Sequence, residues 1–175
     1  KLTKTDEKGN KLEGATFEIL SEDGSKVLAT KTTDSNGEIL VTDLTAGTYK
    51  YKETKAPSGY VLDTGLKTFT ISKNNEVVSV NVINGKSVGK LIITKKDVSS
   101  GKLLPNTKFK IYASDKETVI TEGITDDKGI ATFTLPMGTY YYQETEAPEG
   151  YMINDEKYKF TLTENGQEER VEMTN

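Results

Sequence analysis

The sequence predicts an all-β protein made of two tandem β-sandwich domains, and three observations carry this prediction. First, apolar residues alternate with polar neighbours at the strand period of two, as at Ala15, Phe17 and Ile19. Second, turn-forming pairs such as Asn36-Gly37 and Asn165-Gly166 interrupt the alternation about every 8 to 12 residues. Third, the chain contains a long internal repeat, and no segment has a helical period.

The repeat divides the chain into two halves of similar sequence. Residues 47–60 recur as residues 138–151, a displacement of 91 positions, and the openings and endings of the halves recur at the same displacement. This predicts one domain over residues 1–86 and a second over residues 87–175. The short segment 85–90 joins them and contains two glycines.

Each domain is expected to hold about seven short strands, as in an immunoglobulin-like sandwich. Abundant Thr, 25 residues in all, suits the half-buried surface of such sheets. In chain order, the alternating apolar residues that indicate strands in the first domain are Leu2, then Ala15, Phe17 and Ile19, then Tyr49 and Tyr51, then Phe69 and Ile71, and finally Val78, Val80 and Val82.

The composition excludes several kinds of chemistry. The 175 residues include no Cys and no His, which excludes disulfides, thiol or Ser-His nucleophiles and ordinary zinc sites. No cofactor or metal is expected. The net charge is −4 and neither half is basic, so nucleic acid is not expected as a partner. No apolar run approaches the ~20 residues of a membrane span, and no signal peptide is recognisable.

For two groups of residues a structural role is preferred over a binding function. Asp34, Asn36, Asp126 and Asp127 could suggest calcium ligands, but the complete acidic ligand loop is missing, so these residues are interpreted as turn formers. The Tyr run at residues 140–142 could be a binding patch, but alternation directs two of the three rings into the core.

Three polar residues break the apolar alternation in each half. In the first half, Lys4 shares its strand face with Leu2, Glu53 follows Tyr49 and Tyr51, and Asn84 follows Val80 and Val82 on the face directed inward. The equivalent residues of the second half are Lys95, Glu144 and Asn175. An unpaired buried charge is costly, so the three residues of each set are expected to be neighbours.

Two rival residues stand close by. Lys96 is the alternative to Lys95, since only one of two adjacent strand residues faces inward. Asn81 is the alternative to Asn84, but it falls on the outward parity.

A buried Lys, Glu and Asn in contact predict a specific reaction. Burial lowers the pKa of an amine and raises that of a carboxyl group, so a close pair can exist in the neutral form. A neutral amine is a nucleophile, and a neutral carboxylic acid can donate a hydrogen bond to the amide carbonyl and move the proton to departing ammonia. The product is a Lys–Asn isopeptide bond that links the first strand to the last. Each set would react once, so no turnover enzyme is expected.

Several motifs resemble one known family. They are Lys4-Thr5-Asp6, residues 12–17 (Leu-Glu-Gly-Ala-Thr-Phe), residues 33–37 (Thr-Asp-Ser-Asn-Gly), and above all residues 53–60 (Glu-Thr-Lys-Ala-Pro-Ser-Gly-Tyr) with their twin at residues 144–151. Together they resemble the Cna B-type, prealbumin-like repeat of Gram-positive surface adhesins and pilins, over almost all of both halves. The second half departs at Asn106-Thr107, where the first has Gly-Ala.

The resemblance implies an inverse immunoglobulin-like sandwich with a spontaneous isopeptide bond in each domain. Lys4 and Asn84 would be linked with Glu53 as the catalytic acid, and Lys95 and Asn175 with Glu144. The implied function is a stalk or spacer in an extracellular, cell-wall-anchored protein whose signal peptide and anchor lie outside this fragment.

The expected partners are the neighbouring domains of the same surface protein, with host extracellular matrix bound through other domains. The fragment is expected to be a monomer without membrane contact. The alternative function is an adhesin domain that itself binds a host matrix protein or glycan.

Overall fold

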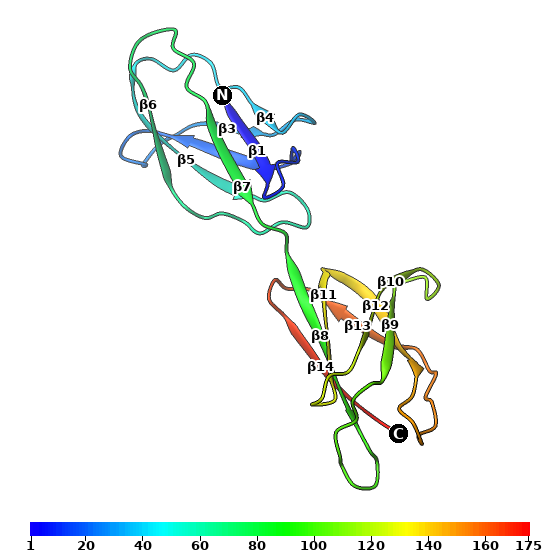
Figure 1. The fold of residues 1–175 in the computed structure, drawn as a ribbon. Helices are drawn as coiled ribbons and strands as arrows, with labels where there is room; N and C mark the ends of the chain where they lie inside the picture. Colours follow the sequence, from blue (N-terminus) through cyan, green and yellow to red (C-terminus); the bar gives the residue numbers. More distant parts are fainter. The chain divides into compact units, whose positions relative to one another are not determined.

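The computed structural model describes residues 1–175 and contains strands but no helix, so the prediction of an all-β fold is confirmed. The chain divides into two compact units, Lys1–Lys86 and Ser87–Asn175, called unit 1 and unit 2 below (Figure 1). The structure has no helix that is long and apolar enough to cross a membrane.

Unit 1 is a sandwich of two sheets. Its three-stranded sheet has the order β4-β1-β7, with bounds Glu38–Ile39 for β4, Leu2–Asp6 for β1 and Val80–Asn84 for β7. Its four-stranded sheet has the order β3-β2-β5-β6, with bounds Val27–Thr32 for β3, Thr16–Leu20 for β2, Gly47–Lys55 for β5 and Lys67–Ile71 for β6.

Unit 2 repeats this topology. Its three-stranded sheet has the order β11-β8-β14, with bounds Ile130–Pro136 for β11, Val88–Lys96 for β8 and Glu168–Thr174 for β14. Its four-stranded sheet has the order β10-β9-β12-β13, with bounds Val119–Ile124 for β10, Lys108–Tyr112 for β9, Gly138–Glu146 for β12 and Tyr158–Leu162 for β13.

The first and last strands of each unit are direct neighbours and run parallel. In unit 1, β1 pairs with β7 from Leu2 opposite Val80 to Asp6 opposite Asn84. In unit 2, β8 pairs with β14, and Lys95 lies opposite Met173. All other strand pairs are antiparallel. The first strand of each unit is therefore the central strand of its smaller sheet, and the last strand lies beside it at the edge.

The inward faces of the two sheets form one core per unit, as the alternation predicted. Aromatic rings from the four-stranded sheet contribute to it. The ring centroids of the stacked pair Tyr49 and Phe69 lie 5.5 Å apart in unit 1, and those of Tyr140 and Phe160 lie 5.6 Å apart in unit 2. The buried residues of the unit 1 core cluster are Leu2, Ala15, Phe17, Ile19, Ile39, Tyr51 and Val82. Those of the unit 2 core cluster are Leu91, Ile93, Phe109, Ile111, Ala131, Phe133, Leu135, Tyr142, Phe160, Leu162 and Met173.

A tight glycine turn fixes the backbone of the strand that carries the first predicted lysine. Gly37 has a φ of 68°, which favours glycine, and its carbonyl accepts the Lys4 N–H at 2.7 Å. A Cβ at Gly37 would lie 2.6 Å from the Lys4 carbonyl oxygen. Gly129 takes the same position against Lys95, whose carbonyl oxygen would lie 2.8 Å from its Cβ. The close approach explains why both turns end in glycine.

The departure of the second half at Asn106-Thr107 leaves the local geometry unchanged. Asn106 has a φ of 64° where Gly14 has 86°, and Asn tolerates this left-handed conformation better than most residues. The Thr107 N–H donates to Thr125 Oγ1 at 2.9 Å, as the Ala15 N–H donates to Thr33 Oγ1 at 3.0 Å.

Two strand ends differ from the sequence expectation. Val78 precedes β7 rather than belonging to it, and Asn175 directly follows β14. In addition, β4 has two residues whereas its counterpart β11 has seven, so the two repeats are not equally complete at this edge.

Candidate functional site

The structure brings the three polar residues of each half together inside the sandwich. In unit 1, Lys4 is on β1, Asn84 is on the neighbouring β7, and Glu53 reaches them from β5 of the opposite sheet. Their relative exposures are 0% for Lys4, 4% for Glu53 and 2% for Asn84. Phe17 on β2 is buried and lies directly opposite Glu53 of β5 in the strand pairing. The charged groups therefore lie in an apolar setting.

In unit 2, the three side chains form a closed hydrogen-bonded set. Lys95 Nζ donates to Glu144 Oε2 at 2.9 Å and to Asn175 Oδ1 at 2.6 Å. Asn175 Nδ2 donates to Glu144 Oε1 at 2.8 Å. Lys95 and Glu144 are fully buried, and Asn175 is half-buried. The carboxylate thus contacts the amine with one oxygen and the amide nitrogen with the other.

In unit 1, the same residues meet with a different hydrogen-bond pattern. Asn84 Nδ2 donates to both carboxylate oxygens of Glu53, at 2.9 and 3.0 Å. Lys4 Nζ lies 4.0 Å from Glu53 Oε1 and donates instead to the Val82 carbonyl at 3.3 Å. Asn84 Oδ1 is buried and has no hydrogen-bond partner. In unit 2 the equivalent acceptor, Asn175 Oδ1, accepts a hydrogen bond from Lys95.

The orientation of the amide differs from the sequence-based expectation in both units. The hydrogen bond from the carboxyl group was expected to go to the Asn carbonyl, whereas the Asn NH₂ group faces the carboxylate in each case. In unit 2, the carbonyl oxygen of the same amide accepts from the Lys95 amine. The acid is therefore placed beside the leaving nitrogen rather than beside the carbonyl oxygen.

A backbone N–H fixes the carboxylate from the far side. The Asp63 N–H donates to Glu53 Oε2 at 2.8 Å, and the Asn154 N–H approaches Glu144 Oε2 at 3.4 Å. Both donors come from the loop that follows the Gly-Tyr pair of the most specific motif. The strand parity that singled out the glutamates carries no information about this contact.

Burial lowers the pKa of Lys4 below its ordinary value, because removal from water disfavours the ammonium form. The charges of Glu53 and Asp63 act in the opposite direction and are the smaller effects. The balance shifts Lys4 toward the neutral amine, which is the nucleophilic form.

The rival residues lie outside this arrangement. Lys96 is partly exposed and its Nζ pairs with Glu172 on the surface at 2.5 Å. Asn81 is exposed on β7. Asp34 Oδ1 accepts the N–H groups of Asn36 and Glu38, as turn-forming aspartates do.

One pair of motif residues has a contact that the sequence analysis did not assign. The Tyr60 hydroxyl reaches Asp6 Oδ2 at 3.4 Å, and its twin Tyr151 donates to Asp97 Oδ2 at 2.9 Å. The tyrosine at the end of the most specific motif therefore contacts the aspartate of the Lys-x-Asp motif. Recurrence of both residues at the same displacement was the available signal. The contact ties the loop that follows the glutamate strand to the end of the lysine strand.

Comparisons with known proteins agree with this architecture. Both halves match the family described as SpaA, prealbumin-like fold domain, over residues 1–86 and 89–175. The chain is 31% identical to serine-aspartate repeat-containing protein D of Staphylococcus aureus (strain Newman) over 164 residues, which is 92% of the chain and 11% of that protein. It is 36% identical to the collagen adhesin of Staphylococcus aureus over 101 residues, which is 52% of the chain and 8% of the adhesin. The chain thus spans about a tenth of the length of these relatives.

Among solved structures, the Bacillus anthracis TIE protein aligns with a TM-score of 0.84 and 40% identity, over 99% of this chain and 33% of that one. A C-terminal fragment of the pilus adhesin SpaC from Lactobacillus rhamnosus GG aligns with a TM-score of 0.62 at 17% identity, over 95% of this chain and 81% of that one, a likeness of fold alone. With both halves matched and the sandwich topology repeated, the chain belongs to the SpaA prealbumin-like fold domain family and contains two tandem copies of that domain.

Proposed function

We propose that each unit forms one intramolecular isopeptide bond, between Lys4 and Asn84 in unit 1 and between Lys95 and Asn175 in unit 2. Glu53 and Glu144 serve as the catalytic acids. The observation that carries the proposal is the position of Glu144, whose two oxygens contact the Lys95 amine at 2.9 Å and the Asn175 amide nitrogen at 2.8 Å. One carboxyl group can therefore take a proton from the nucleophile and deliver it to the leaving group.

The reaction balances without any added reagent. The neutral amine of Lys95 attacks Asn175 Cγ and forms the new C–N bond, and the carbonyl electrons move onto Oδ1. Glu144 accepts the proton that the amine loses and passes it to Nδ2. The Cγ–Nδ2 bond then breaks, the carbonyl reforms and ammonia leaves. Lys95 and Glu144 are fully buried, which limits the access of competing water to the reacting groups.

The cross-link would join strands that already pair side by side. Lys4 is on β1 and Asn84 is on β7, and these strands run parallel at the two ends of the unit. A pulling force applied through the chain ends reaches the covalent bond before it can separate the sheets. This arrangement supports a structural stalk or spacer function rather than turnover catalysis.

We infer that the parent protein is an extracellular, cell-wall-anchored surface protein of a Gram-positive bacterium. Its relatives include the collagen adhesin of Staphylococcus aureus, and the chain covers only a small part of the curated relatives. Within it, the domains 1–86 and 87–175 are proposed as independently folding spacers. Their partners are neighbouring domains, and host matrix is bound elsewhere in the protein.

Peptide mapping tests the bond assignment. Proteolysis of the purified chain and tandem mass spectrometry should recover branched peptides that join Lys4 to Asn84 and Lys95 to Asn175. Linear peptides with an intact Lys4 and an intact Asn84 would contradict the assignment for unit 1.

Single-molecule pulling tests the stalk function. If Lys4 and Asn84 are linked, the intervening chain cannot extend, and unit 1 should show no unfolding step. An unlinked unit would release about 270 Å of chain, since an extended residue spans about 3.3 to 3.6 Å. A step of that length in the wild-type chain, or saturable binding of the chain to a host matrix protein, would favour the adhesin alternative.

A further inference from the structure

The loop that follows the glutamate strand contacts the ends of both strands that the proposed cross-link would join. In unit 1, the Tyr60 hydroxyl reaches the carboxylate of Asp6, the last residue of β1. The Val61 N–H donates at 2.9 Å to the carbonyl of Gly85, which directly follows β7. One short segment therefore connects the lysine strand to the asparagine strand.

A tight turn fixes the tyrosine in both units. The Tyr60 N–H donates to the Pro57 carbonyl at 3.1 Å, and the Tyr151 N–H donates to the Pro148 carbonyl at 3.1 Å. The glycine before each tyrosine has a positive φ, 82° in unit 1 and 86° in unit 2, which favours glycine. The Pro-x-Gly-Tyr part of the most specific motif thus forms a turn that sets the position of the tyrosine.

The aspartate that the tyrosine contacts is itself held by a turn. Asp97 Oδ1 accepts hydrogen bonds from the N–H and hydroxyl groups of Ser99 and Ser100, while Oδ2 accepts from Tyr151. Asp6 Oδ1 likewise accepts two backbone N–H groups of the turn that follows β1. The hydrogen bond to Asp97 raises the pKa of the Tyr151 hydroxyl, so this group stays protonated and remains a donor.

In unit 2, a short tyrosine contact occurs together with a close lysine. The Tyr151 hydroxyl lies 2.9 Å from Asp97 Oδ2. Three residues further along, the Asn154 nitrogen is 3.4 Å from Glu144 Oε2. The same carboxylate oxygen accepts the Lys95 amine at 2.9 Å. The loop N–H thus stands back from the carboxylate where the amine reaches it.

In unit 1, the distances follow the reverse order. The Tyr60 hydroxyl is 3.4 Å from Asp6 Oδ2, and the Asp63 N–H donates to Glu53 Oε2 at 2.8 Å. Lys4 Nζ remains 4.0 Å from Glu53 Oε1. A longer tyrosine contact therefore coincides with a loop N–H that holds the carboxylate and with an amine that does not reach it.

We propose that Tyr60 and Tyr151 are positioning residues for the cross-linking reaction. When the tyrosine is bound to its aspartate, the loop N–H is held back and the glutamate carboxyl group can contact the lysine amine. Neither hydroxyl contacts the lysine, the glutamate or the asparagine of its unit, so each tyrosine acts through the loop and the glutamate. This inference rests on the reaction proposed above and adds the residues that set its rate.

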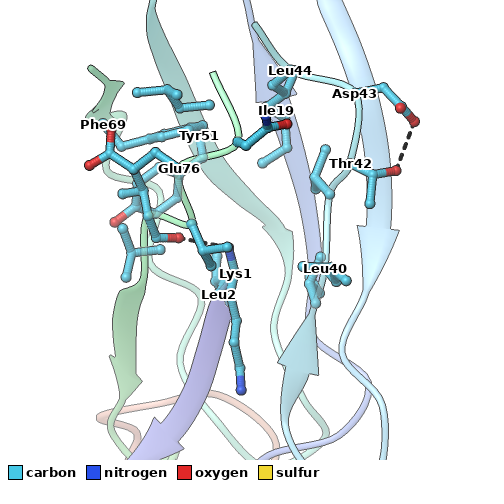
Figure 2. Close-up of a pocket in the computed structure, with 17 residues that line it drawn as sticks. Lys1, Leu2, Ile19, Leu40, Thr42, Asp43, Leu44, Tyr51, Phe69 and Glu76 are labelled. Carbon is cyan, nitrogen blue, oxygen red and sulfur yellow. Dashed lines mark hydrogen bonds between the residues drawn. The ribbon is translucent and has the colours of Figure 1, made fainter. Parts of the chain in front are cut away.

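The apolar groove of unit 1 takes no part in this arrangement. It has a volume of about 420 Å³ and surrounds the beginning of β1, where Leu2 and Tyr51 line it (Figure 2). Asp6 lies at the other end of β1, and neither Asp6 nor Tyr60 nor Glu53 lines the groove. The loop is therefore the segment that can place the carboxyl group.

Matched tyrosine variants test the proposal in a Lys4→Ala chain, in which only unit 2 can react. Tyr151→Phe removes the hydroxyl that contacts Asp97, whereas the control Tyr140→Phe removes one that donates to the Pro136 carbonyl at 3.0 Å. The chains are made by cell-free synthesis and quenched in denaturant at intervals, and intact mass records the loss of ammonia with time. Tyr151→Phe should slow this loss about tenfold, because a misplacement of about 1 Å can cost about 100-fold in rate. Tyr140→Phe should react at the rate of its parent.

An amide signal separates positioning from a general loss of stability. In an Asn175→Ala chain no cross-link can form in unit 2, so the arrangement before reaction can be observed by NMR. Addition of Tyr151→Phe should move the Asn154 amide proton downfield, because the loop N–H comes closer to the carboxylate, as the Asp63 N–H does in unit 1. Addition of Tyr140→Phe should leave this signal in place.

Equal rates of ammonia loss in the two Phe variants would overturn the proposal, and so would an Asn154 amide signal that Tyr151→Phe leaves unchanged. If no chain loses ammonia, the cross-link itself fails, and the amide signal alone then decides whether the tyrosine places the loop. Failure of the positioning role is therefore distinguishable from failure of the proposed reaction.

Discussion

Lys95 Nζ lies 2.6 Å from Asn175 Oδ1, so the amine and the amide that it would attack are in contact within the folded unit. In unit 1 the corresponding acceptor, Asn84 Oδ1, is buried without a partner. An unsatisfied buried acceptor is costly, whereas the equivalent acceptor in unit 2 is satisfied by Lys95. The geometry of unit 2 is therefore the clearer guide to the reactive arrangement.

Removal of the acid should separate folding from cross-linking. In Glu53→Ala, unit 1 should fold with Lys4 and Asn84 unreacted, because the sheets assemble from their strands and the bond forms afterwards. Glu53→Gln keeps hydrogen-bonding capacity but cannot relay a proton, so it should also stop the reaction. Intact mass spectrometry should find one ammonia loss in each variant, from unit 2. Loss of two ammonia molecules from Glu53→Ala would exclude Glu53 as the acid.

Adjacent lysines provide a matched comparison in unit 2. Lys95→Ala should abolish the cross-link and lower the stability of unit 2, whereas Lys96→Ala should preserve it, because Lys96 pairs with Glu172 on the surface. In the chain-entropy model, a link across about 80 residues contributes about 4 to 5 kcal/mol. Thermal unfolding and trypsin digestion should show unit 2 weakened in Lys95→Ala only. Equal losses in both variants would point to a general surface effect.

Strand parity explains why so much of the fold and of the candidate site follows from the sequence. A period of two assigns each residue to a face, so a polar residue among inward apolar ones identifies Lys4, Glu53 and Asn84 as buried. The repeat then identifies the same set in the second half. The confirmed all-β fold rests on the same alternation.

The remaining features depend on geometry that parity does not determine. Alternation gives the face of Asn84 but not the rotation of its amide, which decides whether the nitrogen or the oxygen meets Glu53. The contact between Tyr60 and Asp6 joins residues 54 positions apart, at loop ends where no period exists.

The two domains should fold and react separately. Fragments 1–86 and 87–175 each contain a complete Lys, Glu and Asn set and a core of their own. Each fragment should give a cooperative thermal transition and lose about 17 Da, the mass of one ammonia molecule. A fragment that stays disordered by circular dichroism, while the full chain folds, would contradict the modular interpretation.

Two glycines with similar backbone conformation separate a steric effect from simple strain. Gly37 and Gly9 have φ values of 68° and 83°, so Ala at either position costs about 1 to 2 kcal/mol of conformational energy. A Cβ at Gly37 would also collide with the Lys4 carbonyl, while nothing lies within 4 Å of one at Gly9. Gly37→Ala should therefore destabilise unit 1 well beyond Gly9→Ala in chemical denaturation. Equal effects would show that the turn does not restrain the Lys4 strand.

The mass of the intact, purified chain tests the central claim most directly. Two Lys–Asn condensations expel two molecules of ammonia, so the chain should be about 34 Da lighter than its sequence mass, without added enzyme or cofactor. The double variant Glu53→Ala, Glu144→Ala is the control and should retain its full sequence mass. A wild-type chain at its unmodified sequence mass would contradict the claim that these buried residues form isopeptide bonds.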